Sequence, residues 1–155
     1  MRGSHVRKMI VICIGILLSF YICGQELESS QWLIKSAIKI NCVIGDYSEP
    51  ELSQKIGKII SYSETSIIFY ENAYQIKNKE KELWTREKLY AETRGSQSKG
   101  IAFEDIGFYG EQILAIQYKA KGYKWPGEFI LMLDSNNAVT IWNGVWYLLE
   151  RINYK

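Results

Sequence analysis

Apolar and polar residues alternate with a period of two through much of the chain after residue 30. This period is typical of a β-strand that has one buried face and one solvated face. The residues that the pattern places together on the apolar face of the first strand are Trp32, Ile34, Ile38, Ile40 and Cys42. We therefore expect a sheet with one buried side and one wet side.

The alternation continues in short segments separated by turn residues. Further strands are predicted over 58–63, 66–71, 73–77, 111–119, 128–134, 138–142 and 145–152. Asn143-Gly144 is the signature of a type I′ turn, in which both central residues have positive φ. The segment 80–92 is rich in helix-forming residues, but its neighbours are strands, and we interpret it as a strand with a helix as the alternative.

Two short helical pieces interrupt the strands. Ser48-Glu49-Pro50-Glu51 has the spacing of a capping box with proline in the first turn, and it predicts a helix that ends at Gly57. Residues 103–106 resemble one helical turn closed by Gly107. The polar segment 93–100 is interpreted as a loop.

Eight or nine short strands without a long helix predict a mainly β protein. A meander of this length covers its sheet edges best by closing on itself. We expect a single small antiparallel up-and-down barrel of about eight strands over residues 25–155, with a β-sandwich as the alternative.

The first part of the chain contains an uncharged apolar segment and does not show the strand pattern. Residues 9–25 carry no charge, follow Arg7 and Lys8, and are short for a membrane span, as is typical of a secretory signal peptide. We expect residues 1–24 to direct export to the periplasm or cell envelope and then to be removed. The alternatives are a lipid anchor on Cys23 and an uncleaved membrane anchor.

The net charge and the types of residue present argue against several classes of function. Residues 1–24 carry three positive charges, so without them the formal net charge changes from +2 to −1. Clustered Lys and Arg, which nucleic-acid binding requires, are missing from the remainder. The only histidine, His5, lies in the first segment, which argues against Ser-His-Asp and Cys-His catalysis. We therefore expect no enzyme, no cofactor and no metal site, and we interpret Cys42 as a small buried hydrophobe.

Two groups of carboxylates are candidates for chemistry. Glu104 and Asp105 are adjacent on a predicted helical turn, so their side chains point apart, whereas a glycosidase needs two carboxyl groups facing one sugar. Asp46, Glu49 and Glu51 lack the spacing of a calcium-binding loop. Neither group predicts a site.

Two residues support a resemblance to a known family. Trp32 stands on the first strand and Arg151 near the end of the last. Over residues 31–153 the chain loosely resembles the bacterial lipocalin-like (calycin) barrels, in which a first-strand tryptophan packs under a last-strand arginine. The family's Gly-x-Trp motif is only partly matched here, because Ser30 stands in the glycine position. The resemblance implies that Trp32 and Arg151 close one end of the barrel.

Aromatic residues are abundant, with 5 Trp, 11 Tyr and 5 Phe. Several lie in predicted connections, where core packing explains them less readily, and aromatic residues are enriched at protein–protein hot spots. The residues that we predict to contact a partner are Tyr47, Phe108, Tyr109, Tyr123 and Trp125. They would form a rim at one end of the barrel; the alternative is that each folds back as a lid.

Two functions fit these features. The first is an exported protein-binding barrel, such as an inhibitor or an immunity protein that neutralises a toxin or hydrolase. The alternative is a carrier of a small apolar ligand, since eight-stranded barrels either fill with side chains or hold one ligand. A filled interior is favoured by the large residues expected to point inward, which are Trp32, Phe69, Phe129, Trp142 and Trp146.

Overall fold

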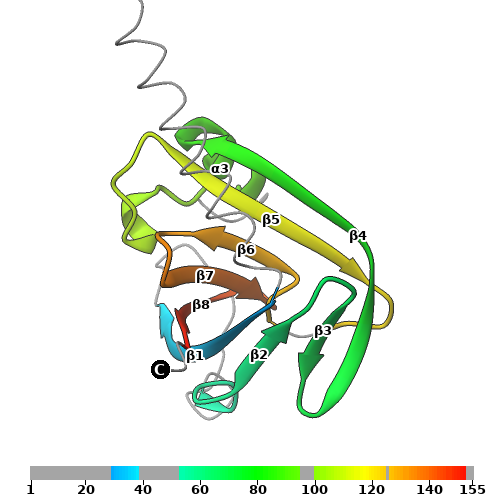
Figure 1. Ribbon diagram of the computed structural model, residues 1–155. Helices are drawn as coiled ribbons and strands as arrows, with labels where there is room; N and C mark the ends of the chain where they lie inside the picture. Colours follow the sequence, from blue (N-terminus) through cyan, green and yellow to red (C-terminus); the bar gives the residue numbers. More distant parts are fainter. Residues whose placement is uncertain (1–28, 39–52, 95–99, 125, 153–155) are drawn as a thin grey trace, which may run out of the picture.

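The computed structural model describes residues 29–38, 53–94, 100–124 and 126–152 as a closed antiparallel barrel (Figure 1). Each strand pairs with the next along the chain, and the first pairs with the last. The strands are β1 (Ser30–Ile38), β2 (Ile59–Tyr62), β3 (Ser66–Phe69), β4 (Asn72–Thr85), β5 (Gln112–Ala120), β6 (Phe129–Met132), β7 (Asn137–Trp142) and β8 (Val145–Arg151). The predicted eight-stranded up-and-down barrel is confirmed, and the sandwich is not formed.

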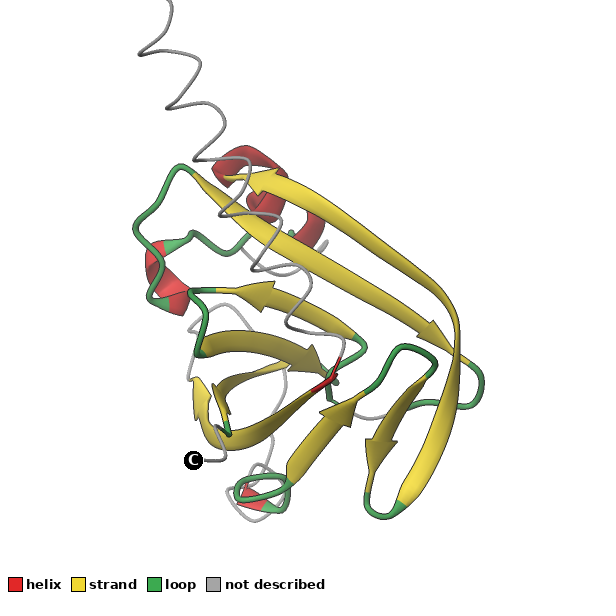
Figure 2. Ribbon diagram, in the orientation of Figure 1, coloured by secondary structure: helices red, strands yellow, loops and turns green. Residues whose placement is uncertain are grey.

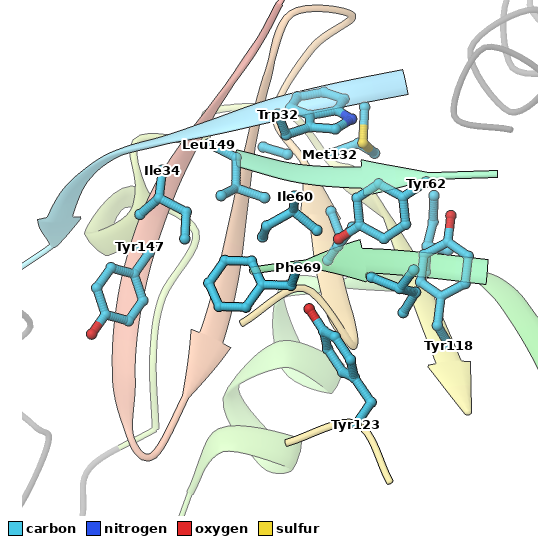
Figure 3. Packing of buried hydrophobic residues seen from close by; sticks show 14 of the residues in the cluster. Trp32, Ile34, Ile60, Tyr62, Phe69, Tyr118, Tyr123, Met132, Tyr147 and Leu149 are labelled. Carbon is cyan, nitrogen blue, oxygen red and sulfur yellow. The ribbon is translucent and has the colours of Figure 1, made fainter. Parts of the chain in front are cut away.

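The side chains that point inward from the strands fill the barrel interior, as predicted. The interior core includes Trp32, Tyr62, Phe69, Tyr118 and Tyr147, all of them buried. Figure 3 shows these rings and the aliphatic side chains between them converging on one another from several strands. Burying a large apolar side chain stabilises a fold by about 1.5–3 kcal/mol, so this cluster is a principal source of stability.

A second core lies outside the barrel wall. We call it the outer core; its buried members are Leu89, Ile101, Phe103, Ile106, Ile113, Ala115, Leu131, Val139 and Trp146. Its strand residues alternate with interior residues: Ile113 and Ala115 face outward, whereas Ile116 and Tyr118 face inward. Strands β5 to β8 are therefore apolar on both faces, and the expectation of one wet side is wrong for this half of the barrel.

The chain between β4 and β5 covers this outer face. It contains α3 (Arg86–Thr93) and η2 (Glu104–Ile106), and Figure 2 shows both helices at the far end of the long β4–β5 hairpin. Helix α3 begins at Thr85, whose hydroxyl accepts a hydrogen bond from the Lys88 N–H at 3.3 Å, and it buries Leu89 completely. The strand prediction for 80–92 is confirmed up to Thr85 and wrong beyond it, because Leu89 has an apolar surface to cover.

A β-bulge redirects the end of the first strand. The pairing of β1 with β8 shifts between Ile34 and Ser36, so that Ile38 lies opposite Trp146. An extra residue moves every later side chain to the other face of a strand. Ile38 therefore packs on the outer core, and its predicted place beside Trp32 and Ile34 is wrong.

Two of the five residues predicted to point into the barrel face the outer core instead. Trp32, Phe69 and Trp142 do belong to the interior core, but Phe129 and Trp146 pack on the outer core. Phe129 and Trp146 lie in runs of consecutive apolar residues, so the period of two gives no indication of which set points inward.

Predicted turns are found where the sequence places them. Asn143 and Gly144 have φ of 48° and 77°, as a type I′ turn requires. The predicted helical turn is η2, and Gly107 ends it with φ of 77°. Among the described residues, no helix is long and apolar enough to span a membrane. The predicted segment 1–24, Cys23, Ile40, Cys42 and the start of the helix at Ser48 lie outside the described residues.

Candidate functional site

The interior of the barrel is occupied by its own side chains. Tyr123, from the β5–β6 connection, is only 5% exposed and meets Tyr74 edge to face, with 5.0 Å between the ring centroids. In Figure 3 its ring points from that connection into the cluster. Its hydroxyl donates a hydrogen bond to the Pro126 carbonyl oxygen. Tyr123 is therefore a lid over the interior, which is the alternative to the predicted rim.

Tyr62 also holds the β5–β6 connection, which carries Tyr123, against the barrel. The Tyr62 hydroxyl donates to the Gly127 carbonyl oxygen at 2.8 Å, and its ring stacks on Tyr118 with centroids 5.0 Å apart. Burial, reinforced by the neighbouring tyrosines, raises the pKa of Tyr62 well above its ordinary value. Tyr62 stays a neutral hydrogen-bond donor, and the lid is held by a bond that is insensitive to ordinary pH changes.

The predicted partner-contacting residues do not gather at one end. In an up-and-down barrel, successive connections alternate between the two ends. The β1–β2 and β5–β6 connections lie at one end, which we call the hairpin end, together with the turns at Tyr70-Glu71 and Asn143-Gly144. Phe108 and Tyr109 lie in the β4–β5 connection, which belongs to the opposite end. A single rim of all three connections is therefore wrong.

The predicted partner-contacting residues also differ in their exposure to solvent. Tyr109 is 79% exposed, whereas Phe108 is half-buried and packs edge to face on Phe103 at 5.1 Å between centroids. Tyr47 and Trp125 lie outside the described residues. Of the predicted contact residues, only Tyr109 presents a whole ring to solvent in the described part of the chain.

A buried lysine is held between two aromatic rings at the hairpin end. The Lys55 Nζ lies 4.9 Å from the centroid of the Trp142 ring and 5.2 Å from that of Tyr70, and the residue is only 6% exposed. Each ring is anchored by its own polar group: Tyr70 donates to the Gln54 carbonyl oxygen at 3.3 Å, and Trp142 to the Lys124 carbonyl oxygen at 2.5 Å. This grouping ties three connections together, and the sequence gives no signal for it.

The lysine contacts should contribute measurably to stability. Desolvated cation–π contacts are worth about 2 kcal/mol, against about 0.5–1 kcal/mol at exposed sites. We expect Lys55→Met, which keeps the aliphatic stem, to lower the free energy of unfolding by about 1–2 kcal/mol in urea titrations. Lys58→Met is the control, because Lys58 is exposed and its ammonium lies over a single ring, that of Tyr70, among the described residues; equal losses in the two variants would contradict this account.

The turn that carries Tyr70 is strained. Tyr70 and Glu71 have φ of 50° and 64°, values that a type I′ turn needs but that asparagine and glycine normally supply. A left-handed conformation costs an L-residue roughly 1–2 kcal/mol. The ring contacts of Tyr70 with Phe69, Lys55 and Lys58 offset this cost and hold the side chain at the surface, 40% exposed.

Next to this turn, apolar side chains face solvent on β2 and β3. Ile60 pairs with Phe69 and Ser61 with Ile68, so Ile59 and Ile68 lie on the outward face. Ile59, Ile68 and Tyr70 are 43%, 40% and 40% exposed. We call these three residues the β2–β3 patch. Leu33 and Ala73 extend it onto the neighbouring strands, as they pair with Ile59 and Ile68.

An exposed positive charge lies beside the β2–β3 patch. Lys35, Lys88, Lys119 and Arg86 each pair with a glutamate. The exposed Lys58, which adjoins Ile59, forms no ion pair with any carboxylate in the described part of the chain. Its ammonium lies 5.2 Å from the Tyr70 ring centroid, so the patch combines apolar surface with an accessible positive charge.

The two residues behind the lipocalin-like resemblance are neighbours. Trp32 and Arg151 are direct partners in the β1–β8 ladder, so their side chains leave the sheet on the same face. The indole N–H of Trp32 donates to the Ser30 hydroxyl at 2.8 Å. Their predicted role in closing this end of the barrel stays a prediction.

A cleft of about 510 Å³ opens at this opposite end. It lies where β1 begins and where β2 and β8 end, and Ser30, Ser61 and Arg151 are among its lining residues. Tyr62 and Ile152 also line it, so the lining combines polar and apolar groups.

Carboxylates outside this cleft serve local structure. Glu104 accepts a hydrogen bond from Arg86, which lowers the pKa of the carboxyl group, and Asp105 accepts one from the Ala102 N–H at 2.8 Å. These are separate roles, as expected for neighbours on a helical turn. Within the described ranges, no group of three or more His, Cys, Asp or Glu residues is arranged to hold a metal ion.

Glu128, beside the lid, is the carboxyl group whose pH response we predict. Partial burial raises its pKa, although a backbone N–H of Ala120 opposes the shift. A carboxyl group whose pKa is raised by folding favours the folded state below its unfolded pKa and loses that contribution as pH rises through the folded value. We expect Glu128→Gln to increase the free energy of unfolding at pH 7 relative to wild type. The gain should vanish near pH 4; an equal gain at both values would contradict it.

Comparison of the chain with protein-family models, with curated proteins and with solved structures finds no match.

Proposed function

We propose that this chain is an exported, non-enzymatic binding protein that recognises another protein in the cell envelope. An inhibitor or an immunity-type protein that neutralises a toxin or hydrolase fits this proposal. The observation that carries it is the filled interior: Trp32, Phe69 and Tyr118 occupy the centre of the barrel, and Tyr123 covers it.

The filled interior argues against the carrier function. A barrel that carries a small apolar ligand needs an internal cavity of about 300–1,000 Å³ lined by apolar groups. Here the described side chains take up that space. The exposed apolar residues lie instead on the outside of the barrel, which is where a protein partner would bind.

Native mass spectrometry of the protein recovered from its own cell envelope tests this function. We expect a complex with a second protein of defined mass. A bound species of a few hundred daltons, with no second protein, would contradict the proposal and favour the carrier. The mass of the recovered chain also tests export, since a start near Gln25 or Glu26 indicates cleavage and an acylated Cys23 indicates a lipid anchor.

A further inference from the structure

We propose that the β2–β3 patch and Lys58 form the surface that contacts the partner, and that the partner presents an apolar group bordered by carboxylates. This inference rests on the proposed function and adds the location of the interface and the chemistry of the partner.

The first argument is the unequal covering of the barrel wall. On β5 to β8 the outward apolar residues are covered by α3, η2 and residues 101–103, so that Leu131, Val139 and Trp146 are fully buried. On β2 and β3 the outward residues Ile59 and Ile68 remain about 40% exposed. Apolar side chains that adjoin one another on a surface are typical of an interaction site.

The second argument is the rigidity of Tyr70. A strained backbone conformation persists only where surrounding contacts hold it, and such strain is concentrated at functional sites. The Tyr70 ring contacts Phe69 edge to face at 4.5 Å, and its hydroxyl bonds to the Gln54 carbonyl oxygen. An aromatic side chain that is already fixed loses little entropy on binding, which favours a role as an anchor.

The third argument is charge. Lys58 adjoins the patch, is exposed, and forms no ion pair with a described carboxylate. Electrostatic complementarity guides association, so an accessible cation beside an apolar patch selects a partner with carboxylates at the matching position. This is the reason to expect an acidic rim on the partner.

A dye provides the first test without the natural partner. Anilinonaphthalene sulfonate combines an apolar ring system with one negative charge, the chemistry proposed for the partner. We expect it to bind the folded full-length protein, and we expect Ile68→Ser and Lys58→Glu each to weaken binding by about tenfold. The matched controls are Leu83→Ser, at 39% exposure, and Arg94→Glu, which changes an exposed charge by the same amount.

The second test uses a photoreactive side chain in place of Ile68 or Leu83 in the full-length chain. We expect a protein to be cross-linked in the cell envelope from position 68 and not from position 83. That protein, identified and purified, should bind Lys58→Glu about tenfold more weakly than wild type. Its affinity for the wild type should also decrease with added salt, as an electrostatic contact requires.

The outcomes separate the two proposals. Equal dye binding by Ile68→Ser and Leu83→Ser would overturn the proposed surface. So would a co-purifying protein whose affinity is unchanged by Lys58→Glu and Ile68→Ser, although the binding function itself would then stand. A chain that retains a small apolar molecule and no protein would overturn the binding function and, with it, this inference. Thermal unfolding of each variant verifies that these exposed substitutions leave the fold intact.

Discussion

Replacing Trp146 by alanine is expected to destabilise the protein by about 3–5 kcal/mol, the range found when a buried tryptophan is truncated. Trp146 is 1% exposed and packs in the outer core beside Ile38 and Leu148. The loss should appear in urea unfolding followed by circular dichroism. Such a cost would establish that the outer wall of β5 to β8 is a true core and not a solvated face.

Two further variants define the cause of this loss. The Trp146 indole N–H is buried and has no hydrogen-bond acceptor among the described residues, so Trp146→Phe should cost much less than Trp146→Ala. Leu83→Ala, on the exposed side of β4, should change the free energy of unfolding by less than about 0.5 kcal/mol. If Trp146→Ala were as mild as Leu83→Ala, α3 and η2 would not be covering this face.

Gly127→Ala is expected to cost about 2–4 kcal/mol, combining a left-handed backbone with overpacking. Gly127 has φ of 104°, and a Cβ atom there would collide with the Tyr62 hydroxyl and lie 3.0 Å from Ile60 Cδ1. The substitution would push the β5–β6 connection away from the barrel mouth. Urea unfolding measures the cost, and intrinsic fluorescence should report the displaced lid.

Gly122 provides the matched control in the same connection. Its φ is 76°, yet a Cβ atom there would meet nothing within 4 Å. Gly122→Ala should therefore cost only the backbone contribution, about 1–2 kcal/mol. Tyr62→Phe removes the colliding oxygen, so it should cost less in the Gly127→Ala background than in wild type. Equal costs for the two glycines would mean that the connection does not rest on Tyr62.

The lid explains why aromatic residues in a connection are an ambiguous signal. A tyrosine flanked by glycines suits an exposed binding loop and an inward-folded lid equally well, because both need a tight turn and a ring with a polar tip. Tyr123 is a lid because Tyr74 and the Pro126 carbonyl are placed to receive it. Those groups come together only when the barrel closes.

The fold class followed from local features. Alternation with a period of two, the Asn143-Gly144 turn and the helical turn ending at Gly107 each depend on a few adjacent residues, and each was found in place. The end of the β4 strand also had a local signal, since Thr85 before a charged helix-forming run is an N-cap. The strands on either side of this segment favour a continuous strand and obscure that signal.

Tertiary structure decided which apolar residues share a core. In β6 to β8 apolar residues occur in consecutive runs, so the sequence cannot distinguish Trp142, which faces the interior, from Trp146, which faces the outer core. A single bulge in β1 reversed the direction of Ile38. The meeting of Lys55 with Tyr70 and Trp142 joins two connections and the end of β7. Local pattern determines the elements of this protein, whereas contacts between distant residues, fixed by strand register and closure, determine its two cores and its exposed surface.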